Sequence, residues 1–118
     1  MFKHIVMWRF IDGAGGKSKK EHALWVKENL EALVGIIPEI KSLEVGVNVC
    51  VAGTAYDAVL VSTFESAEAM EVYKVHPAHV AVAAYFKGIS QAYKLIYENF
   101  KANDELGFYR FFYAKSMT

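Results

Sequence analysis

The stretch that decides the fold reads Tyr73-Lys74-Val75-His76-Pro77-Ala78-His79-Val80. It places two of the chain's four histidines and one phenol around a single proline. Proline disfavours a helical residue before it and starts a helix well, so the stretch predicts that one helix ends and another begins at residues 76–77. The same stretch gathers the side chains of a candidate site.

The segments at the start of the chain predict a strand followed by a helix. Residues 2–11 alternate with a period of two and carry apolar residues on both faces, which predicts a strand that is covered on both sides. Ser18 followed by Glu21 has the spacing of a capping box, so we expect a helix to begin near Ser18. Gly35 and Pro38 then supply its stop.

The remaining segments complete the order of a sandwich. Residues 40–51 and 56–64 predict two strands of a hairpin, and Ser66 predicts the start of a helix. The helical piece after the proline is expected over residues 77–88, and residues 92–100 predict the last strand. This βαββαβ order is that of a ferredoxin-like α+β sandwich.

The chain of 118 residues is long enough for one compact core and too short for two. We expect this domain to span residues 1–100, with residues 101–118 as an aromatic C-terminal extension. Five of the six residues 108–113 are aromatic, and such a surface does not stay bare in water. The extension is expected to fold back as an added strand or arm, and an arm that strengthens a dimer is favoured over a lid on a pocket.

The expected sheet has both helices on one face, which leaves its other face bare although that face also carries large apolar residues. Packing against the sheet of a second copy would cover it and give a dimeric α/β barrel with the helices outside. The sequence therefore predicts a homodimer with an obligate type of interface.

Charge and composition argue against several partners. Thirteen basic and thirteen acidic residues cancel, so the chain lacks the positive field that nucleic-acid binding requires. Its apolar stretches are shorter than the roughly 18 residues of a membrane helix. A single cysteine, Cys50, and the absence of a signal-peptide pattern predict a cytoplasmic protein.

Three histidines raise the question of a metal site. His76 and His79 are three residues apart, and His4 in the first strand could converge with them. A zinc centre needs three or four protein ligands, yet the chain has neither a histidine–carboxylate signature on a regular helix nor a cysteine cluster. We therefore predict no metal site.

Three further side chains are assigned from the pattern of the sequence. Trp8 could line a pocket, but a large aromatic residue in a small α+β domain more often fills the core, which we favour here. Trp25 stays open between the two positions. His22 is expected to be a partly exposed surface residue of the first helix.

Several short motifs, at this order and spacing, resemble the stress-responsive A/B barrel (Dabb) family over residues 1–100. The family is one of ferredoxin-like proteins that form dimeric barrels, which agrees with the fold expected above. The motifs are Lys3-His4-Ile5-Val6, Ile37-Pro38 with Leu43-Glu44-Val45-Gly46, Tyr56-Asp57, Phe64-Glu65-Ser66 and His76-Pro77-Ala78-His79.

The resemblance also implies a site. The family includes a plant polyketide cyclase, olivetolic acid cyclase, which closes a linear tetraketide by aldol chemistry without a metal or an organic cofactor. By match to its motif, the catalytic pair is Tyr73 and His79, and His4 lines the pocket. Where the cyclase carries a further pocket histidine, after the tyrosine that matches Tyr56, this chain has Ala58. The ligand-binding candidates are Trp8, Tyr56, Ala58 and His76.

The chemistry of the pair can be weighed from the residues alone. His79 would be the third residue of a helix that begins at Pro77, where the helix dipole disfavours the imidazolium and keeps a neutral base. Tyr73 could then hold a carbonyl or enolate oxygen while His79 removes a proton. The alternative is that His79 donates to a backbone carbonyl at the helix junction and Tyr73 packs in the core.

Two classes of function therefore stay open. In the first, which we favour, the protein is a homodimer that binds a small apolar or aromatic ligand near His4, Tyr73 and His79, with no reaction assigned. In the second it is a cofactor-independent, polyketide cyclase-like lyase or isomerase that uses Tyr73 and His79 as an acid/base pair. Haem-degrading and monooxygenase roles, which the same barrel also supports, have less weight because their motifs are absent.

Overall fold

The computed structural model describes residues 1–100, and residues 101–118 lie outside the described part. The expected aromatic extension and the domain limit near residue 100 therefore stay predictions. The elements follow in the order β1 (Phe2–Phe10), α1 (Lys19–Glu31), β2 (Ser42–Val47), β3 (Ala58–Phe64), α2 (Ala67–Val75), α3 (Pro77–Ala83) and β4 (Ser90–Asn99). Short 3₁₀ turns lie at Ala14–Gly16, Ala32–Gly35 and Ala84–Gly88.

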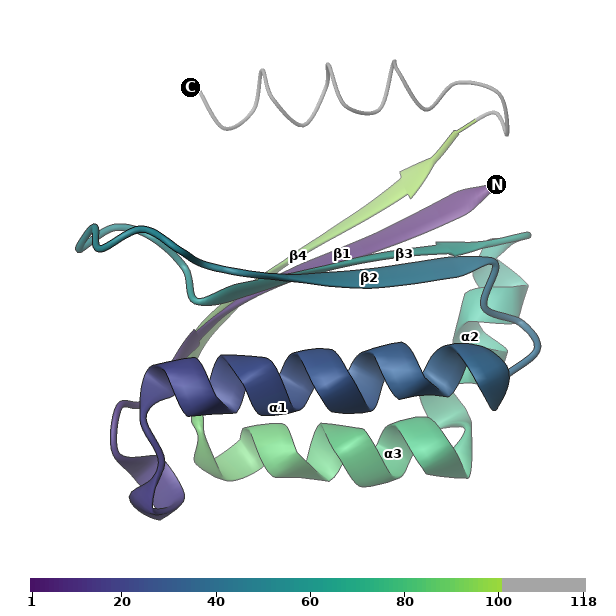
Figure 1. The fold of residues 1–118 in the computed structure, drawn as a ribbon. Coiled ribbons are helices and arrows are strands. Elements are labelled where there is room, and N and C mark those ends of the chain that lie inside the picture. Colours follow the sequence, from purple (N-terminus) through teal and green to yellow (C-terminus); the bar gives the residue numbers. More distant parts are fainter. Residues whose placement is uncertain (101–118) are drawn as a thin grey trace.

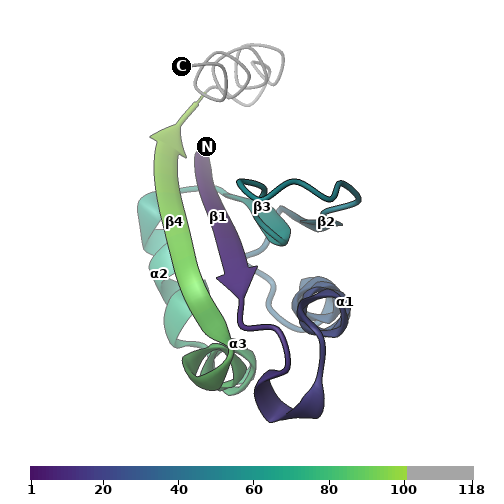
Figure 2. The ribbon, with the colours of Figure 1, turned by 90° about the vertical axis from the view of Figure 1, so that its left-hand side faces the viewer.

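The elements form two layers, a four-stranded antiparallel sheet and a layer of helices on one of its faces (Figures 1 and 2). The strand order is β2-β3-β1-β4, so β1 is central and β2 and β4 are the edges. This arrangement is the predicted ferredoxin-like α+β fold. No helix in residues 1–100 is long and apolar enough to cross a membrane.

Alternation along β1 divides its side chains between the two faces of the sheet. Phe2, Val6, Trp8 and Phe10 belong to the hydrophobic core beneath the helices, and His4 points to the same side. The opposite, outer face carries apolar residues from three strands. They are Ile5 and Met7 of β1, Val59 and Val61 of β3, and Ile96 of β4.

Side-chain caps set the helix boundaries where the sequence predicts them. The Ser18 hydroxyl accepts from the Glu21 N–H, and the Glu21 carboxylate accepts from the Ser18 N–H, which is the reciprocal capping box. The Ser66 hydroxyl accepts from the Ala69 N–H at the start of α2. His76 has extended backbone angles (φ −61°, ψ 133°) between α2 and α3, so the predicted break at the proline is confirmed.

The hairpin strands are shorter than predicted. β2 ends at Val47 because the Asn48 side chain bonds the backbone of Cys50 twice, donating to its carbonyl at 2.8 Å and accepting from its N–H at 2.9 Å. The Asn48 N–H still donates to the Asp57 carbonyl at 3.0 Å, and the local turn replaces the pairing that residues 49–51 would need. β3 begins at Ala58 rather than at residue 56.

The expectation of a partly exposed His22 is wrong, since its side chain is buried with an exposed fraction of 1%. Its Nε2 lies 2.8 Å from the carbonyl oxygen of Ala14, and its Nδ1 lies 2.8 Å from the hydroxyl of Tyr85. Because a carbonyl only accepts, Nε2 carries the proton and Nδ1 accepts from Tyr85. Trp25, left open by the sequence, stacks on Tyr85 with ring centroids 3.6 Å apart.

The free edge of β2 is closed by an ion pair from α1. Lys27 and Glu31 lie 2.8 Å apart, and the Lys27 ammonium donates to the Val45 carbonyl at 2.7 Å. The Glu31 carboxylate accepts from the Val45 N–H at 3.0 Å. Both backbone groups of Val45 are thereby occupied, which disfavours the addition of a further strand at this edge.

Candidate functional site

Three elements meet beneath the first half of β1 and bring together His4, Tyr73 and His79, which we call the His–Tyr cluster. Tyr73 lies in the last turn of α2, and His79 lies in the first turn of α3. Their ring centroids are 4.4 Å apart. His4 reaches the same region from the sheet, since it pairs with Ser62 of β3, the strand whose Phe64 packs on Tyr73. The structure thus joins the three residues that the sequence predicted as catalytic.

Tyr73 is the most deeply buried member of the cluster, with an exposed fraction of 0%. Its ring packs against Phe64, with centroids 5.0 Å apart. Its hydroxyl is buried and has no hydrogen-bond partner within the described part of the chain. Burial raises the pKa of the phenol, so the group stays protonated and can serve as a hydrogen-bond donor.

His79 is held in one tautomer by the end of α2. Its Nδ1 lies 2.9 Å from the Lys74 carbonyl oxygen, which can only accept, so Nδ1 carries the proton and Nε2 keeps its lone pair. Burial, followed by the charge of Lys74, lowers the pKa of His79 and outweighs the hydrogen bond that raises it. The hydrogen bond to a junction carbonyl, which the sequence offered as the alternative to catalysis, is therefore present, and the role of His79 as a base stays a prediction.

His4 is neutral for the same physical reason. Burial, followed by the charges of His79 and Lys74, lowers its pKa from 6.5 to about 4. Its Nδ1 is buried without a hydrogen-bond partner among residues 1–100. Tyr97 of β4 stacks on the imidazole with centroids 4.9 Å apart and an interplanar angle of 10°. One side of His4 is therefore covered by an aromatic ring.

The four residues predicted to bind a ligand lie in a helix cap, in the core or near the far end of β1. The His76 Nδ1 accepts from the Ala78 N–H at 3.0 Å and so caps α3. Trp8 is in the core and stacks on Phe86, with centroids 4.9 Å apart. Ala58 pairs with Trp8 across the strands, about 13 Å along β1 from His4. The Tyr56 ring lies near the same end, 5.1 Å from the Arg9 guanidinium.

Two residues that the sequence did not single out belong to the site. Tyr97 covers His4, and the carbonyl of Lys74 fixes the tautomer of His79. Alternation along the last strand would have put Tyr97 on the helix side, but its pairing with His4 depends on a register that the sequence does not show. The Lys74 carbonyl could have been recognised as one of the unpaired carbonyls that end a helix before proline.

Within residues 1–100 no three His, Cys, Asp or Glu side chains lie close enough together to hold a metal ion. His4 and His79 share the cluster, but the Nδ1 of His79 is used by a carbonyl and His76 is used by the helix cap. The chemistry available to the cluster is that of neutral donors and acceptors.

Comparison with known proteins identifies one family. A family model described as Stress responsive A/B Barrel Domain matches residues 2–96. The stress-response A/B barrel domain-containing protein HS1 of Arabidopsis thaliana is 33% identical over 88 residues, which cover 73% of this chain and 77% of HS1.

Solved structures share the fold. A dimeric protein of unknown function with a ferredoxin-like fold from Bacteroides fragilis has a TM-score of 0.68 at 26% identity, covering 84% of this chain and 95% of its own. A dimeric ferredoxin-like protein of unknown function from Thermobifida fusca has a TM-score of 0.70 at 22% identity, covering 84% of this chain and 90% of its own.

The lowered pKa of His4 predicts a pH-dependent stability. Between pH 6.5 and about 4 the unfolded chain binds a proton at His4 that the folded chain does not, so the free energy of unfolding falls as the pH decreases through this window. For this group the loss is about 2 kcal/mol between pH 7 and pH 4.5. Urea denaturation of the wild type and of His4→Gln at both pH values measures it. The variant is expected to lose less stability on acidification; equal losses would show that His4 is not kept neutral by the fold.

Proposed function

The chain belongs to the stress-responsive A/B barrel domain family, and we propose that it binds a small apolar or aromatic ligand at the His–Tyr cluster. The observation that supports this proposal is that two buried polar atoms of the cluster, the Tyr73 hydroxyl and the His4 Nδ1, have no hydrogen-bond partner within residues 1–100. A buried polar group left unpaired costs about 1–3 kcal/mol. A ligand that paired with these atoms would recover that free energy.

The surroundings of the cluster indicate the kind of ligand. The Tyr73 hydroxyl offers a donor and the His79 Nε2 offers an acceptor, while the aromatic rings of Phe64 and Tyr97 pack against Tyr73 and His4. Ionic groups would be poorly matched, since burial keeps both histidines neutral. We therefore expect a small planar molecule that carries a carbonyl or a hydroxyl group, and the proposal calls for no cofactor or metal.

A second candidate is polyketide cyclase-like catalysis at the same cluster, as a lyase or isomerase. The fixed tautomer of His79 favours it, because a neutral Nε2 beside a protonated phenol is an acid/base pair suited to proton removal next to a carbonyl. Tyr73 would stabilise the enolate oxygen while His79 takes the proton. Such a pair contributes on the order of 10²–10⁴ in rate. Ala58 at the position of the cyclase's further pocket histidine argues for a different substrate.

We also propose that the protein is a homodimer that pairs through the outer face of the sheet. Two neighbours in fold are described as dimeric. The outer face holds two hollows of about 520 and 290 Å³, the first lined by Val59 and Val61 and the second by Met7 and Val59. Because Lys27 and Glu31 occupy the β2 edge, packing through the face is favoured over pairing at that edge.

Light scattering tests the homodimer. The wild type is expected to have twice the chain mass of 13.2 kDa at micromolar concentration. Val61→Lys puts a charge on the outer face opposite Glu44 and is expected to give a folded monomer. Val75→Lys, at an exposed position on α2, serves as the control and should stay dimeric. A monomeric wild type, or a dimer that persists in Val61→Lys, would contradict the proposed interface.

Thermal shift measurements with acetophenone and 2,4-dihydroxyacetophenone test ligand binding. A ligand that binds the native state raises the melting temperature. Tyr73→Phe removes an unpaired hydroxyl, so the free energy of unfolding is expected to stay within about 1 kcal/mol of the wild type while the ligand-induced shift is lost. Tyr93→Phe, on the exposed part of β4, is the matched control and should keep the shift. If the Tyr73→Phe variant lost several kcal/mol of stability and kept the ligand-induced shift, the hydroxyl would have a structural role and no role in binding.

Proton exchange in D₂O tests the catalytic candidate. If His79 removes a proton next to a carbonyl, the methyl group of acetophenone is expected to exchange with deuterium faster with wild-type protein than in buffer. His79→Gln should return the rate to that of buffer, because the amide cannot act as a base. Ligand binding without faster exchange would leave the binding proposal in place and exclude the catalytic one for this ketone.

A further inference from the structure

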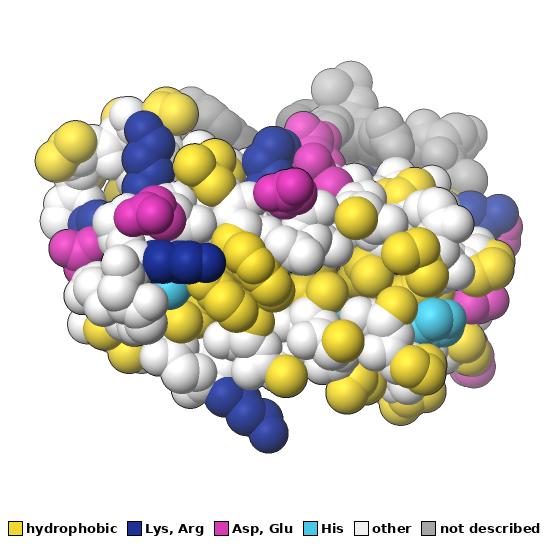
Figure 3. All heavy atoms as spheres, turned by 60° about the horizontal axis from the view of Figure 1, so that its bottom comes forward, with side chains coloured by type: hydrophobic (Ala, Val, Ile, Leu, Met, Phe, Trp, Pro, Cys, Tyr) yellow, Lys and Arg dark blue, Asp and Glu magenta, His cyan; other side chains and the backbone are white. Residues whose placement is uncertain are grey.

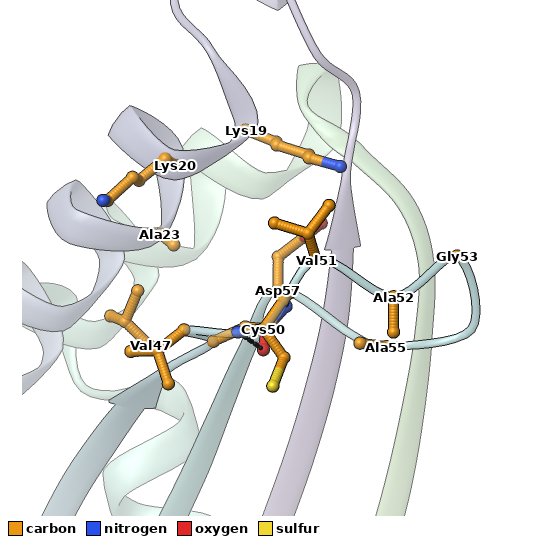
Figure 4. Close-up of a pocket in the computed structure, with 12 residues that line it drawn as sticks. Lys19, Lys20, Ala23, Val47, Cys50, Val51, Ala52, Gly53, Ala55 and Asp57 are labelled. Atoms are coloured by element: carbon orange, nitrogen blue, oxygen red, sulfur yellow. Dashed lines mark hydrogen bonds between the residues drawn. The ribbon is translucent and has the colours of Figure 1, made fainter.

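A pocket lined by Lys19, which we call the Lys19 pocket, lies at the opposite end of β1 from the His–Tyr cluster, and we propose that it binds a small amphipathic monocarboxylate. The cavity has a volume of about 310 Å³ and lies between the start of α1 and the loop that joins β2 to β3 (Figure 4). Asp57 ties the pocket to β1. The Asp57 N–H donates to the Trp8 carbonyl at 2.8 Å, and the Asp57 carboxylate accepts from the Phe10 N–H at 2.7 Å. Trp8 and Phe10 are roughly 13–20 Å along the strand from His4.

One half of the pocket is apolar. Val47 and Val51 reach into it from the hairpin, and Ala23 faces them from α1 (Figure 4). Val51 and its neighbour Val49 are fully exposed to solvent, although large apolar side chains are normally covered. An apolar group of a ligand would shield this wall.

The loop that carries this wall is held in place by hydrogen bonds. Arg9 donates to the Gly53 carbonyl at 3.0 Å, and the Ala55 N–H donates to the Ala52 carbonyl at 3.1 Å. The Asn48 side chain fixes the backbone of Cys50 at the start of the loop. The pocket is therefore formed before any ligand enters, which lowers the entropic cost of binding.

The other half of the pocket is cationic. Lys19 and Lys20 stand at its rim, and within residues 1–100 neither ammonium group has an ion-pair partner. Lys19 extends over the cavity towards Val51 and Asp57, whereas the amino end of Lys20 points away from it (Figure 4). Lys19 therefore supplies the ammonium group that an anion in the cavity would meet, while the Asp57 carboxylate is engaged by the Phe10 N–H.

The anion would be held by the Lys19 side chain rather than by the start of the helix. The Lys19 N–H already donates to the Asp12 carboxylate at 2.9 Å, and the Glu21 N–H donates to the Ser18 hydroxyl. A cavity of this volume is at the small end of the range for ligand sites. A short aliphatic carboxylate fits these features, with its charge at Lys19 and its chain against Val47 and Val51.

Hexanoate, followed by amide chemical shifts in NMR, is the probe. Saturable shifts are expected at residues 19–23 and 47–57, and binding should weaken at least fivefold in Lys19→Glu. Lys87→Glu, an exposed lysine of the turn Ala84–Gly88, is the charge-matched control and should bind like the wild type. Asp57→Asn keeps an oxygen acceptor for Phe10 and removes a repelling charge, so it should bind about twofold more tightly or better.

Hexanol provides the test of charge, and it is expected to bind at least fivefold more weakly than hexanoate. Equal affinity for hexanol and hexanoate, or unchanged affinity in Lys19→Glu, would overturn the assignment of a carboxylate. Shifts confined to residues 73–80 would place the ligand at the His–Tyr cluster and remove the second site. The readout is independent of the ketone experiments, since the two sets of amides lie at opposite ends of the sheet.

Discussion

The structure depends on the break that Pro77 makes between α2 and α3. Proline has no N–H to continue a helix, and the residue before it is forced out of the helical conformation, as the ψ of 133° at His76 shows. The break frees carbonyls at the end of α2, and the Lys74 carbonyl is satisfied by the His79 side chain instead. The imidazole is therefore oriented by the interruption of the helix itself, which also brings it onto the ring of Tyr73.

Burial then sets the chemistry of the cluster. The same desolvation that raises the pKa of Tyr73 lowers the pKa of His4 and of His79, so all three groups are neutral near pH 7. Unpaired polar atoms at such a place reduce stability, and the packing of Tyr73 on Phe64 within a continuous core offsets that cost. Within residues 1–100 the Tyr73 hydroxyl and the His4 Nδ1 have no partner, which is the basis of the proposal that a ligand pairs with them.

Much of the fold could be predicted from the sequence because its signals are local. The caps at Ser18 and Ser66 and the break at Pro77 each act over about three residues, and the structure has all of them. His22 could not be placed in this way, because its partner Tyr85 lies 63 positions away in the chain. Tyr97 was missed for the same reason, since only the pairing of β1 with β4 puts it on His4. The Lys19 pocket depends on how the hairpin loop closes over α1, and no sequence pattern shows that.

The division of the sheet into two faces makes the proposed dimer compatible with the two proposed binding sites. The helices lie on one face, where exposed hydrophobic side chains form a band across the middle of the molecule (Figure 3). The His–Tyr cluster and the Lys19 pocket are both built from these helices together with the sheet, whereas the proposed interface uses Val59 and Val61 on the other face. A dimer formed through that face would leave the layer of helices uncovered. One end of β1 carries His4, and the backbone at its other end binds Asp57. Because β1 is paired on both sides in the centre of the sheet, it holds the two sites apart.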